Sequence, residues 1–325
     1  MSGAGARPAG GGRAGVSLRK DSVPGERPFA SVLIANRGEI ARRIIRACRE
    51  LGVATVAVYS DADADALHVR EADQAVRIGP PPAAQSYLVV DAIVGAARAT
   101  GAEAIHPGYG FLSEQPALAE AAVAAGVTFV GPRPRTLAEL GNKVAARARA
   151  RAADVPIVPG TLEPVDPADG DALARLGDEI GYPLLIKAAA GGGGRGMRRV
   201  DEPAELAGAA AAAAGEAVAA FGDGSLYLER YVERARHVEV QLLGDETGNV
   251  VALGERDCSM QRRHQKLVEE APAPGLDRTQ RERLHGLAVE VARTVGLLNA
   301  ATAEFLLAPS GEFWFLEVNA RLQVE

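Results

Sequence analysis

Lys187 stands a few residues ahead of four consecutive glycines, Gly191 to Gly194, and this combination suits the binding of phosphate groups. Glycine lacks a side chain and adopts positive φ readily, so its backbone N–H groups can close around an anion such as polyphosphate. Segment 182–188 before the glycines and segment 197–200 after them both have strand-like sequences. The glycines are therefore expected in a loop that closes a hairpin, with Lys187 at its base.

The usual glycine-rich nucleotide motifs do not fit this loop. Gly191, Gly193 and Gly196 satisfy G-x-G-x-x-G, but that motif requires a following helix and a strand-like segment follows here. The chain also has no G-x-x-x-x-G-K-[ST] sequence. A glycine flap above a lysine instead suggests phosphates held between strands, as in protein kinases or ATP-grasp enzymes. A flexible glycine-rich turn without function is the alternative.

The composition indicates an ordinary globular protein. The chain has 325 residues, 47% of them apolar and 24% charged, which allows two or three compact units. Its net charge of −6 disfavours nucleic-acid binding, and its apolar runs are too short for a membrane span. The only cysteines, Cys48 and Cys258, lie far apart in sequence, so we expect no disulfide and a cytoplasmic location.

The first third of the chain divides into a tail and a domain. Residues 1–28 are rich in Gly, Ala and Arg and are expected to be a disordered tail, with organelle targeting as the alternative. Residues 29–131 alternate strands and helices, which predicts an N-terminal domain with a doubly wound parallel sheet. The predicted elements are strands 30–35, 53–58, 104–106 and 127–130 and helices 39–51, 90–100 and 116–125. The first turn, 36–38, has one glycine, so a dinucleotide site is not expected.

Three further segments follow along the chain. Residues 132–159 read as a helical connector, with the helix at 136–153, and residues 160–231 as a small lid domain that carries the glycine flap and a helix at 203–220. Residues 232–325 turn to long antiparallel strands. The predicted elements there are strands 237–243, 250–255, 302–308 and 313–325 and a helix at 278–294. The fold class is therefore α/β, becoming α+β in the C-terminal part.

A predicted hairpin near the C-terminus places two carboxylates side by side. If the turn within 309–312 is centred between Ser310 and Gly311, Glu304 lies opposite Glu317, with Cβ atoms about 5 Å apart. Like charges so placed need a cation or a shared proton. Carboxylate oxygens suit Mg²⁺ or Mn²⁺, and Asn319 on the same face offers another oxygen. A solvated outer face with the two charges splayed apart is the alternative.

Two polar segments accompany this hairpin. Strict alternation in the predicted strand 313–325 would direct Glu317, Asn319, Arg321, Gln323 and Glu325 to one face and Val318, Ala320, Leu322 and Val324 to the other. The alternative explanation of this pattern is that the polar residues form the solvent-exposed face of an edge strand. Segment 256–266 is a second polar cluster, which taken alone resembles a solvated loop. No base stands beside Cys258 in the sequence, so we interpret it as non-catalytic.

Several motifs together resemble those of biotin carboxylases. They are segments 34–40 (IANRGEI), 106–114 (HPGYGFLSE), 191–197 with its glycines, 255–266 and 317–325. The resemblance is continuous from Phe29 to the last residue. It implies an ATP-grasp fold that uses ATP to activate bicarbonate and to carboxylate biotin on a carrier protein.

The resemblance also implies a role for individual residues. The nucleotide-binding set is Lys143, Lys187, Gly193, Gly194, Glu229, Arg230, Tyr231, Val232, His237, Gln261, His264, Glu304 and Glu317. The implied Mg²⁺ or Mn²⁺ ligands are Glu304, Glu317 and Asn319, and the implied bicarbonate ligands are Lys266, Arg321, Gln323 and Val324. Arg321, Lys266 and Glu325 would be catalytic, with Glu325 as the general base that deprotonates bicarbonate and Arg321 steadying the charge on biotin.

The sequence departs from the family pattern at Asn142, where aspartate is usual before Lys143, and the family sequence continues beyond Glu325. We therefore expect an incomplete C-terminal lobe that is inactive alone. Biotin must arrive on another segment or chain because no Met-Lys-Met motif is present. The resemblance implies a biotin carboxyl carrier and a carboxyltransferase as partners, and a homodimer at full length.

Segment 268–275 favours the acyl-CoA carboxylases (acetyl-, propionyl- or methylcrotonyl-CoA type) over pyruvate carboxylases, which implies a place in fatty acid metabolism. Two alternatives stay open. One is another ATP-grasp ligase, such as a carbamoyl-phosphate synthase or a purine-pathway carboxylase. The other is a nucleotide-binding fragment without catalytic activity.

Overall fold

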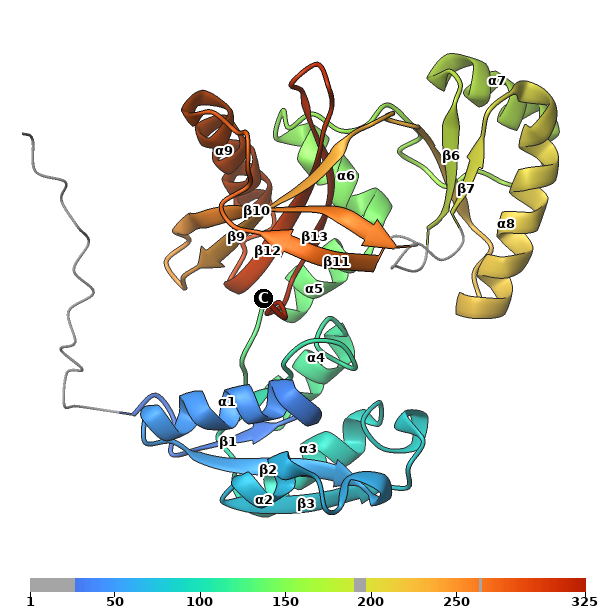
Figure 1. The fold of residues 1–325 in the computed structure, drawn as a ribbon. Coiled ribbons are helices and arrows are strands. Elements are labelled where there is room, and N and C mark those ends of the chain that lie inside the picture. Colours follow the sequence, from blue (N-terminus) through green and yellow to red (C-terminus); the bar gives the residue numbers. More distant parts are fainter. Residues whose placement is uncertain (1–26, 190–196, 263–264) are drawn as a thin grey trace, which may run out of the picture.

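The chain folds around three separate sheets (Figure 1). The structure, a computed structural model, describes residues 27–189, 197–262 and 265–325, without the side chains of Lys143 and Phe221. The predicted tail lies outside the described residues except for its last two positions. Within the described residues, no helix is long and apolar enough to cross a membrane.

The N-terminal sheet is parallel and doubly wound, as predicted. Its strand order is β3-β2-β1-β4-β5. Val32 and Ile34 pack with the first helix on one face, and Leu33 packs with the helices of the other face. The strands are β1 Ser31–Ile34, β2 Ala54–Ser60, β3 Gln74–Gly79, β4 Ala104–His106 and β5 Thr128–Phe129, and the helices are α1 Gly38–Glu50, α2 Leu67–Glu71, α3 Val90–Thr100 and α4 Pro116–Ala124. The sequence analysis missed β3 and α2.

The predicted helix at 136–153 is instead two helices, α5 Pro134–Gly141 and α6 Lys143–Ala152. The break occurs at Asn142, whose backbone is extended (φ −96°, ψ 105°). The Asn142 side chain caps α6 because its Oδ1 accepts a hydrogen bond from the Ala145 N–H at 3.0 Å. Both helices contribute apolar side chains to the same core as the C-terminal sheet.

A small antiparallel sheet, in the order β7-β6-β8, lies beside the C-terminal sheet (Figure 1). Pairing of Ile186 with Arg198 confirms the predicted hairpin around the glycines, although residues 190–196 themselves lie outside the described part. The elements are β6 Leu184–Ala188, β7 Arg198–Val200, β8 Leu226–Arg230, α7 Gly170–Ile180 and α8 Leu206–Phe221. The predicted helix at 203–220 begins with a 3₁₀ turn, Pro203–Glu205, before α8.

The C-terminal sheet is antiparallel, in the order β11-β10-β9-β12-β13, and α9 (Arg278–Thr294) packs against it at the predicted position. Its strands are β9 Arg236–Gly244, β10 Val250–Arg262, β11 Gln265–Glu270, β12 Asn299–Leu307 and β13 Phe313–Asn319. The predicted strand 250–255 is thus too short. The polar segment 256–266 alone resembles a solvated loop, but its described residues, 256–262 and 265–266, belong to the paired strands β10 and β11.

The prediction of a continuous strand over 313–325 is wrong beyond Asn319. The Ala320 N–H donates to the carboxylate of Glu114 at 3.2 Å instead of extending the ladder with β12. Alternation then fails: Gln323 is only 6% exposed and Val324 is 62% exposed. The chain turns away from the sheet where the N-terminal domain contacts it.

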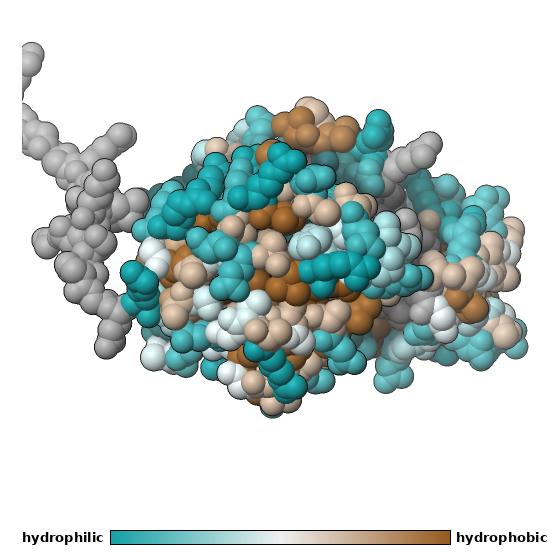
Figure 2. Space-filling view, turned by 90° about the horizontal axis from the view of Figure 1, so that it is seen from below, coloured by the Kyte–Doolittle hydropathy of each residue, from teal (hydrophilic) through white to brown (hydrophobic). Residues whose placement is uncertain are grey.

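Hydrophilic and hydrophobic side chains are interspersed over the face of the molecule that Figure 2 shows from below. Exposed apolar residues of the N-terminal domain include Leu51, Leu67 and Val123, each on a different helix or helix end. Such scattered apolar side chains are normal on a protein surface. Exposed apolar residues of this kind therefore do not mark a binding surface.

Candidate active site

Three carboxylates stand in one row across the C-terminal sheet. Glu239 on β9 lies opposite Glu304 on β12, and Glu304 lies opposite Glu317 on β13. Side chains of directly opposite residues share a face and come within about 5 Å. The predicted pairing of Glu304 with Glu317 is confirmed.

The pairing arises by a different route from the predicted one. Phe305 pairs with Phe315 and Leu307 with Phe313, so the turn is centred on Ser310 and not after it. A bulge beyond Phe315 then shifts the register by one residue and brings Glu304 opposite Glu317.

Two cations offset the charge of the row. Lys266 Nζ donates to Glu304 Oε1 at 2.8 Å and also contacts Glu239. Arg256, directly opposite Glu239 on β10, donates from Nε to the other Glu239 oxygen. Burial lowers the pKa of Lys266, but the two carboxylates more than compensate, so its pKa is raised. Lys266 is therefore a fixed positive charge at any physiological pH.

Polar side chains complete the surroundings of Glu304. Asn319 Nδ2 donates to Glu304 Oε1 at 2.8 Å. His237 Nε2 lies 3.0 Å from Glu304 Oε2, close enough for an ion pair although the angle is not that of a hydrogen bond. Gln261 Nε2 lies 2.7 Å from His237 Nδ1. Burial raises the pKa of Glu304, but the contacts with His237 and Lys266 outweigh it, and the net direction is down.

The same cluster has the donor set of a cation site. Ligand atoms of His237, Glu239 and Glu304 all lie within 4.8 Å of one another. Glu317 and Asn319 adjoin this group through the strand register. Carboxylate and amide oxygens suit Mg²⁺ or Mn²⁺, so the residues present fit such an ion.

Residues 321–325 lie beside the row. Arg321 Nη1 donates to Gln323 Oε1 at 2.8 Å, and Arg321 Nε donates to Glu114 Oε2 at 3.0 Å. Glu325 Oε1 lies 3.5 Å from Arg256 Nε, and burial raises the pKa of Glu325. Val324 is exposed, so its side chain adds no buried contact here.

On the lid side, a buried carboxylate holds two cations. Glu229 on β8 contacts Lys187 on β6 and Arg147 on α6, and both Glu229 and Arg147 are almost fully buried. Arg147 Nη2 also donates to the Val158 carbonyl at 2.8 Å. The chain continues from Glu229 through Val232 toward β9. Lys187 thus lies at the base of the hairpin, as predicted, with its ammonium paired to Glu229.

The next two residues contact the segment between α7 and β6. Arg230 Nη2 donates to the Ile180 carbonyl at the end of α7 at 2.6 Å. The Tyr231 N–H donates to the Pro183 carbonyl at 2.9 Å. Both residues therefore link the end of β8 to the turn before β6.

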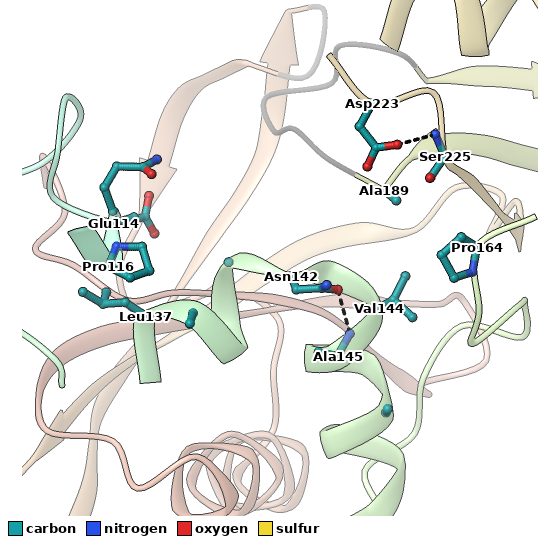
Figure 3. A pocket seen from close by; sticks show the side chains of 14 residues that line it. Glu114, Pro116, Leu137, Asn142, Val144, Ala145, Pro164, Ala189, Asp223 and Ser225 are labelled. Atoms are coloured by element: carbon teal, nitrogen blue, oxygen red, sulfur yellow. Dashed lines mark hydrogen bonds between the residues drawn. The ribbon is translucent and has the colours of Figure 1, made fainter. Parts of the chain in front are cut away.

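A pocket of about 580 Å³ opens between the N-terminal domain, the helices α5 and α6, and the segments that flank the small sheet β7-β6-β8 (Figure 3). It is lined by Glu114 from the N-terminal domain, by Asn142 and Val144 at the start of α6, and by Asp223 and Ser225 ahead of β8. Ala189, the last described residue before the glycines, also lines it. Of the predicted nucleotide ligands, Gly193, Gly194, His264 and the side chain of Lys143 lie outside the described part of the chain.

The sequence analysis missed four residues of this region, Glu114, Arg147, Glu239 and Arg256. A signal existed for Glu239, because His237, Glu239 and Gln241 alternate with apolar residues along a predicted strand. Arg256 could have been found the same way once β10 was extended. Glu114 ends the motif 106–114, but its partner and that of Arg147 could not be predicted, since they lie 206 and 82 residues away.

Comparison with known families gives two adjoining matches. Residues 28–137 match "Biotin carboxylase, N-terminal domain" and residues 142–325 match "Carbamoyl-phosphate synthase L chain, ATP binding domain". The chain is 54% identical over 294 residues to the biotin carboxylase of Allochromatium vinosum, covering 90% of this chain and 65% of that protein. It is 50% identical to the propionyl-CoA carboxylase alpha chain of Ruegeria pomeroyi, covering 91% and 43%.

Solved structures agree. A Campylobacter jejuni biotin carboxylase, described as a complex with β,γ-ATP, matches with a TM-score of 0.88 and 47% identity over 91% of this chain and 66% of that one. The biotin carboxylase domain of Hydrogenobacter thermophilus 2-oxoglutarate carboxylase, described with MgADP and bicarbonate, matches with a TM-score of 0.87 and 48% identity, covering 91% and 65%. The chain therefore spans less than two thirds of these relatives. Its adjoining family matches and its fold show that it belongs to the biotin carboxylase family, with an ATP-binding domain of the carbamoyl-phosphate synthase L chain type.

Proposed function

We propose that the protein catalyses ATP-dependent carboxylation of biotin on a carrier protein, with bicarbonate as the carbon source. The observation that carries the proposal is the row of Glu239, Glu304 and Glu317, flanked by Lys266 and Arg256. Three adjacent carboxylates suit a divalent cation, and the fixed ammonium of Lys266 beside them suits an anion. A site that accepts both fits a reaction between a metal-bound nucleotide and bicarbonate.

The nucleotide phosphates would contact Lys187, Lys143 and the loop with Gly193 and Gly194. The adenine side of the site would be formed by residues 229–232, with His237, Gln261 and His264 completing the nucleotide pocket. Glu304, Glu317 and Asn319 would hold Mg²⁺ or Mn²⁺, which neutralises phosphate charge when bound. The relatives described with ATP or MgADP support this assignment.

Bicarbonate would bind between Lys266 and Arg321, near Gln323 and the backbone of Val324. Glu325, whose pKa is raised by burial, would take the bicarbonate proton. The bicarbonate oxygen then attacks the γ-phosphorus of ATP, and ADP leaves. The resulting carboxyphosphate would break down to phosphate and CO₂, and the released phosphate would take the proton from the biotin nitrogen. That nitrogen would then bond to CO₂, while Arg321 stabilises the negative charge that develops on biotin.

The division into an N-terminal domain (29–131), connector (132–159), lid (160–231) and C-terminal lobe (232–325) is part of this proposal. So are a carrier protein and a carboxyltransferase as partners, a homodimer, a cytoplasmic location and a role in acyl-CoA carboxylation and fatty acid metabolism. The acyl-CoA assignment depends on segment 268–275. Similar relatives include a pyruvate carboxylase subunit as well as a propionyl-CoA carboxylase chain.

The test measures biotin-dependent ADP release with bicarbonate, using the protein in the full length that its gene encodes. Glu304→Gln should abolish turnover while the circular dichroism spectrum is unchanged. Glu312→Gln, in the exposed turn of the same hairpin, is the matched control and should keep wild-type turnover. ADP release by the wild type that needs neither biotin nor bicarbonate would refute carboxylation and favour another ATP-grasp activity.

A further inference from the structure

The loop that follows β4, residues 106–114, has a backbone shape that few sequences adopt. Gly108, Gly110 and Phe111 all have positive φ (65°, 67° and 44°). At Gly108 a Cβ would lie only 2.9 Å from a side-chain carbon of Ile40, so glycine is required there. The sequence of the loop therefore favours one particular backbone conformation, and contacts with other residues must stabilise that conformation.

Asn36, in the turn after β1, supplies the first of these contacts. Its Nδ2 donates to the Pro107 carbonyl and to the Tyr109 carbonyl, both at 2.7 Å. Asn36 is buried, so both hydrogen bonds are shielded from water. This contact joins segment 34–40 to segment 106–114.

Ring stacking supplies the second contact. Phe111 stacks on Tyr87 with ring centroids 5.0 Å apart and planes 6° from parallel. The Tyr87 hydroxyl donates to Asp63 Oδ2 at 2.6 Å, and Arg37 Nε donates to the same carboxylate at 2.7 Å. The loop is thus anchored to the N-terminal sheet at two separate points.

The far end of the loop reaches the C-terminal lobe through Glu114. One carboxylate oxygen accepts the Ala320 N–H at 3.2 Å, and the other accepts Arg321 Nε at 3.0 Å. The loop and residues 320–322 also enclose a cavity of about 50 Å³. A single side chain therefore fixes both the backbone before Arg321 and the base of its guanidinium group.

We propose that Glu114 is a positioning residue that directs Arg321 toward the anionic substrate, and that the anchored loop 106–114 is the brace that holds it. Because Glu114 occupies Nε, the two Nη groups remain available and donate to Gln323 and Asn319, beside the carboxylate row. The inference rests on the proposed role of Arg321 in bicarbonate binding. It adds that the N-terminal domain takes part in the reaction through this contact.

Hydrogen exchange tests the brace without reference to activity. In Glu114→Ala, exchange of the Ala320 amide should accelerate at least about tenfold, because its acceptor is gone. In Glu114→Gln the amide oxygen can still accept this N–H, so protection should be largely retained. Glu120→Ala, an exposed carboxylate on α4, is the matched control and should leave the exchange unchanged. Equal exchange in the wild type and Glu114→Ala would overturn the brace.

Kinetics of biotin-dependent ADP release test the positioning role. Both Glu114→Ala and Glu114→Gln should raise KM for bicarbonate roughly tenfold, because neither keeps the charged pair with Arg321. KM for ATP should change less than about twofold. Faster exchange at Ala320 with an unchanged KM for bicarbonate would overturn the positioning role and leave a purely structural contact. A wild type that does not use bicarbonate would refute the proposed function, while the exchange data would still decide whether the brace exists.

Discussion

At the scale of single residues, the site combines adjacent carboxylates with cations that offset their negative charge. Glu239 and Glu304 are both buried and lie side by side, so each would be destabilised without a cation. Lys266 spans the two, and Arg256 contacts Glu239 on its other side. The two cations thus offset the negative charge of the row, and the contacts with His237 and Lys266 lower the pKa of Glu304 despite its burial.

Glu239→Gln should destabilise the fold by about 3 kcal/mol, because it leaves Lys266 and Arg256 without a shared buried partner. Urea unfolding monitored by circular dichroism measures the change. Glu246→Gln, in the exposed turn between β9 and β10, is the control and should stay within about 0.5 kcal/mol of the wild type. Equal stability of both variants would mean that relief of repulsion from Glu304 fully offsets the lost ion pairs, contrary to this prediction.

His106 should make stability depend on pH. Burial lowers its pKa to about 4 from a usual value near 6.5, and its Nδ1 accepts the Gly108 N–H at 3.0 Å, which requires the neutral ring. Between these two pH values the unfolded chain binds the proton and the folded chain does not. Stability is therefore complete above pH 6.5 and falls as the pH drops toward 4, by up to about 3 kcal/mol.

The comparison of the wild type with His106→Gln isolates this effect, since the other histidines are present in both proteins. Urea unfolding between pH 4 and 7 should give a shallower loss of stability in the variant. Parallel curves for the two proteins would contradict the assignment to His106.

At the scale of elements, regular helices and strands could be predicted from the sequence, whereas the bulge in the C-terminal hairpin and the end of β13 could not. The helix at 278–294 and the parallel strands follow from periodicity that one short window contains. The bulge that pairs Glu304 with Glu317 depends on packing across the sheet, and the end of β13 depends on Glu114 in another domain. Such features arise from contacts distant in sequence, so the local pattern does not reveal them.

The break between α5 and α6 has a local cause that can be tested at Asn142. Asn142→Ala should cost about 1 kcal/mol because the first turn of α6 loses its cap, whereas Asn142→Asp should keep the cap and gain slightly from the helix dipole. Thermal unfolding of the three proteins at neutral pH measures both changes. Asn142→Asp as unstable as Asn142→Ala would show that the side chain is held by something other than capping.

At the scale of the whole molecule, three sheets with separate cores meet at the site, and a few buried side chains join them. Arg147 is the clearest joint between the C-terminal core and the lid. It extends from α6 to Glu229 on β8, and its side chain is 1% exposed. Because the same carboxylate binds Lys187, the joint also holds the lysine proposed to contact phosphate. The two ends lie 82 residues apart, so the sequence alone could not pair them.

Breaking this joint should uncouple the lid from the rest of the molecule. Arg147→Leu leaves the buried Glu229 with Lys187 as its one remaining cation and should lower the free energy of unfolding by about 3 kcal/mol. Glu229→Leu should lower it by a similar amount, because Arg147 and Lys187 both lose their carboxylate partner. The double variant should be more stable than the sum of the two changes predicts, by at least about 1 kcal/mol, because the second substitution removes a partner that is already unpaired.

Fluorescence of Trp314, the only tryptophan, reports unfolding of the C-terminal sheet, and far-ultraviolet circular dichroism reports unfolding of all three sheets and their helices. The two signals should coincide in the wild type and separate in Arg147→Leu, with the lid unfolding first. Strictly additive energies with coincident signals in every variant would show that Arg147 stabilises α6 locally and does not join the lid to the C-terminal core.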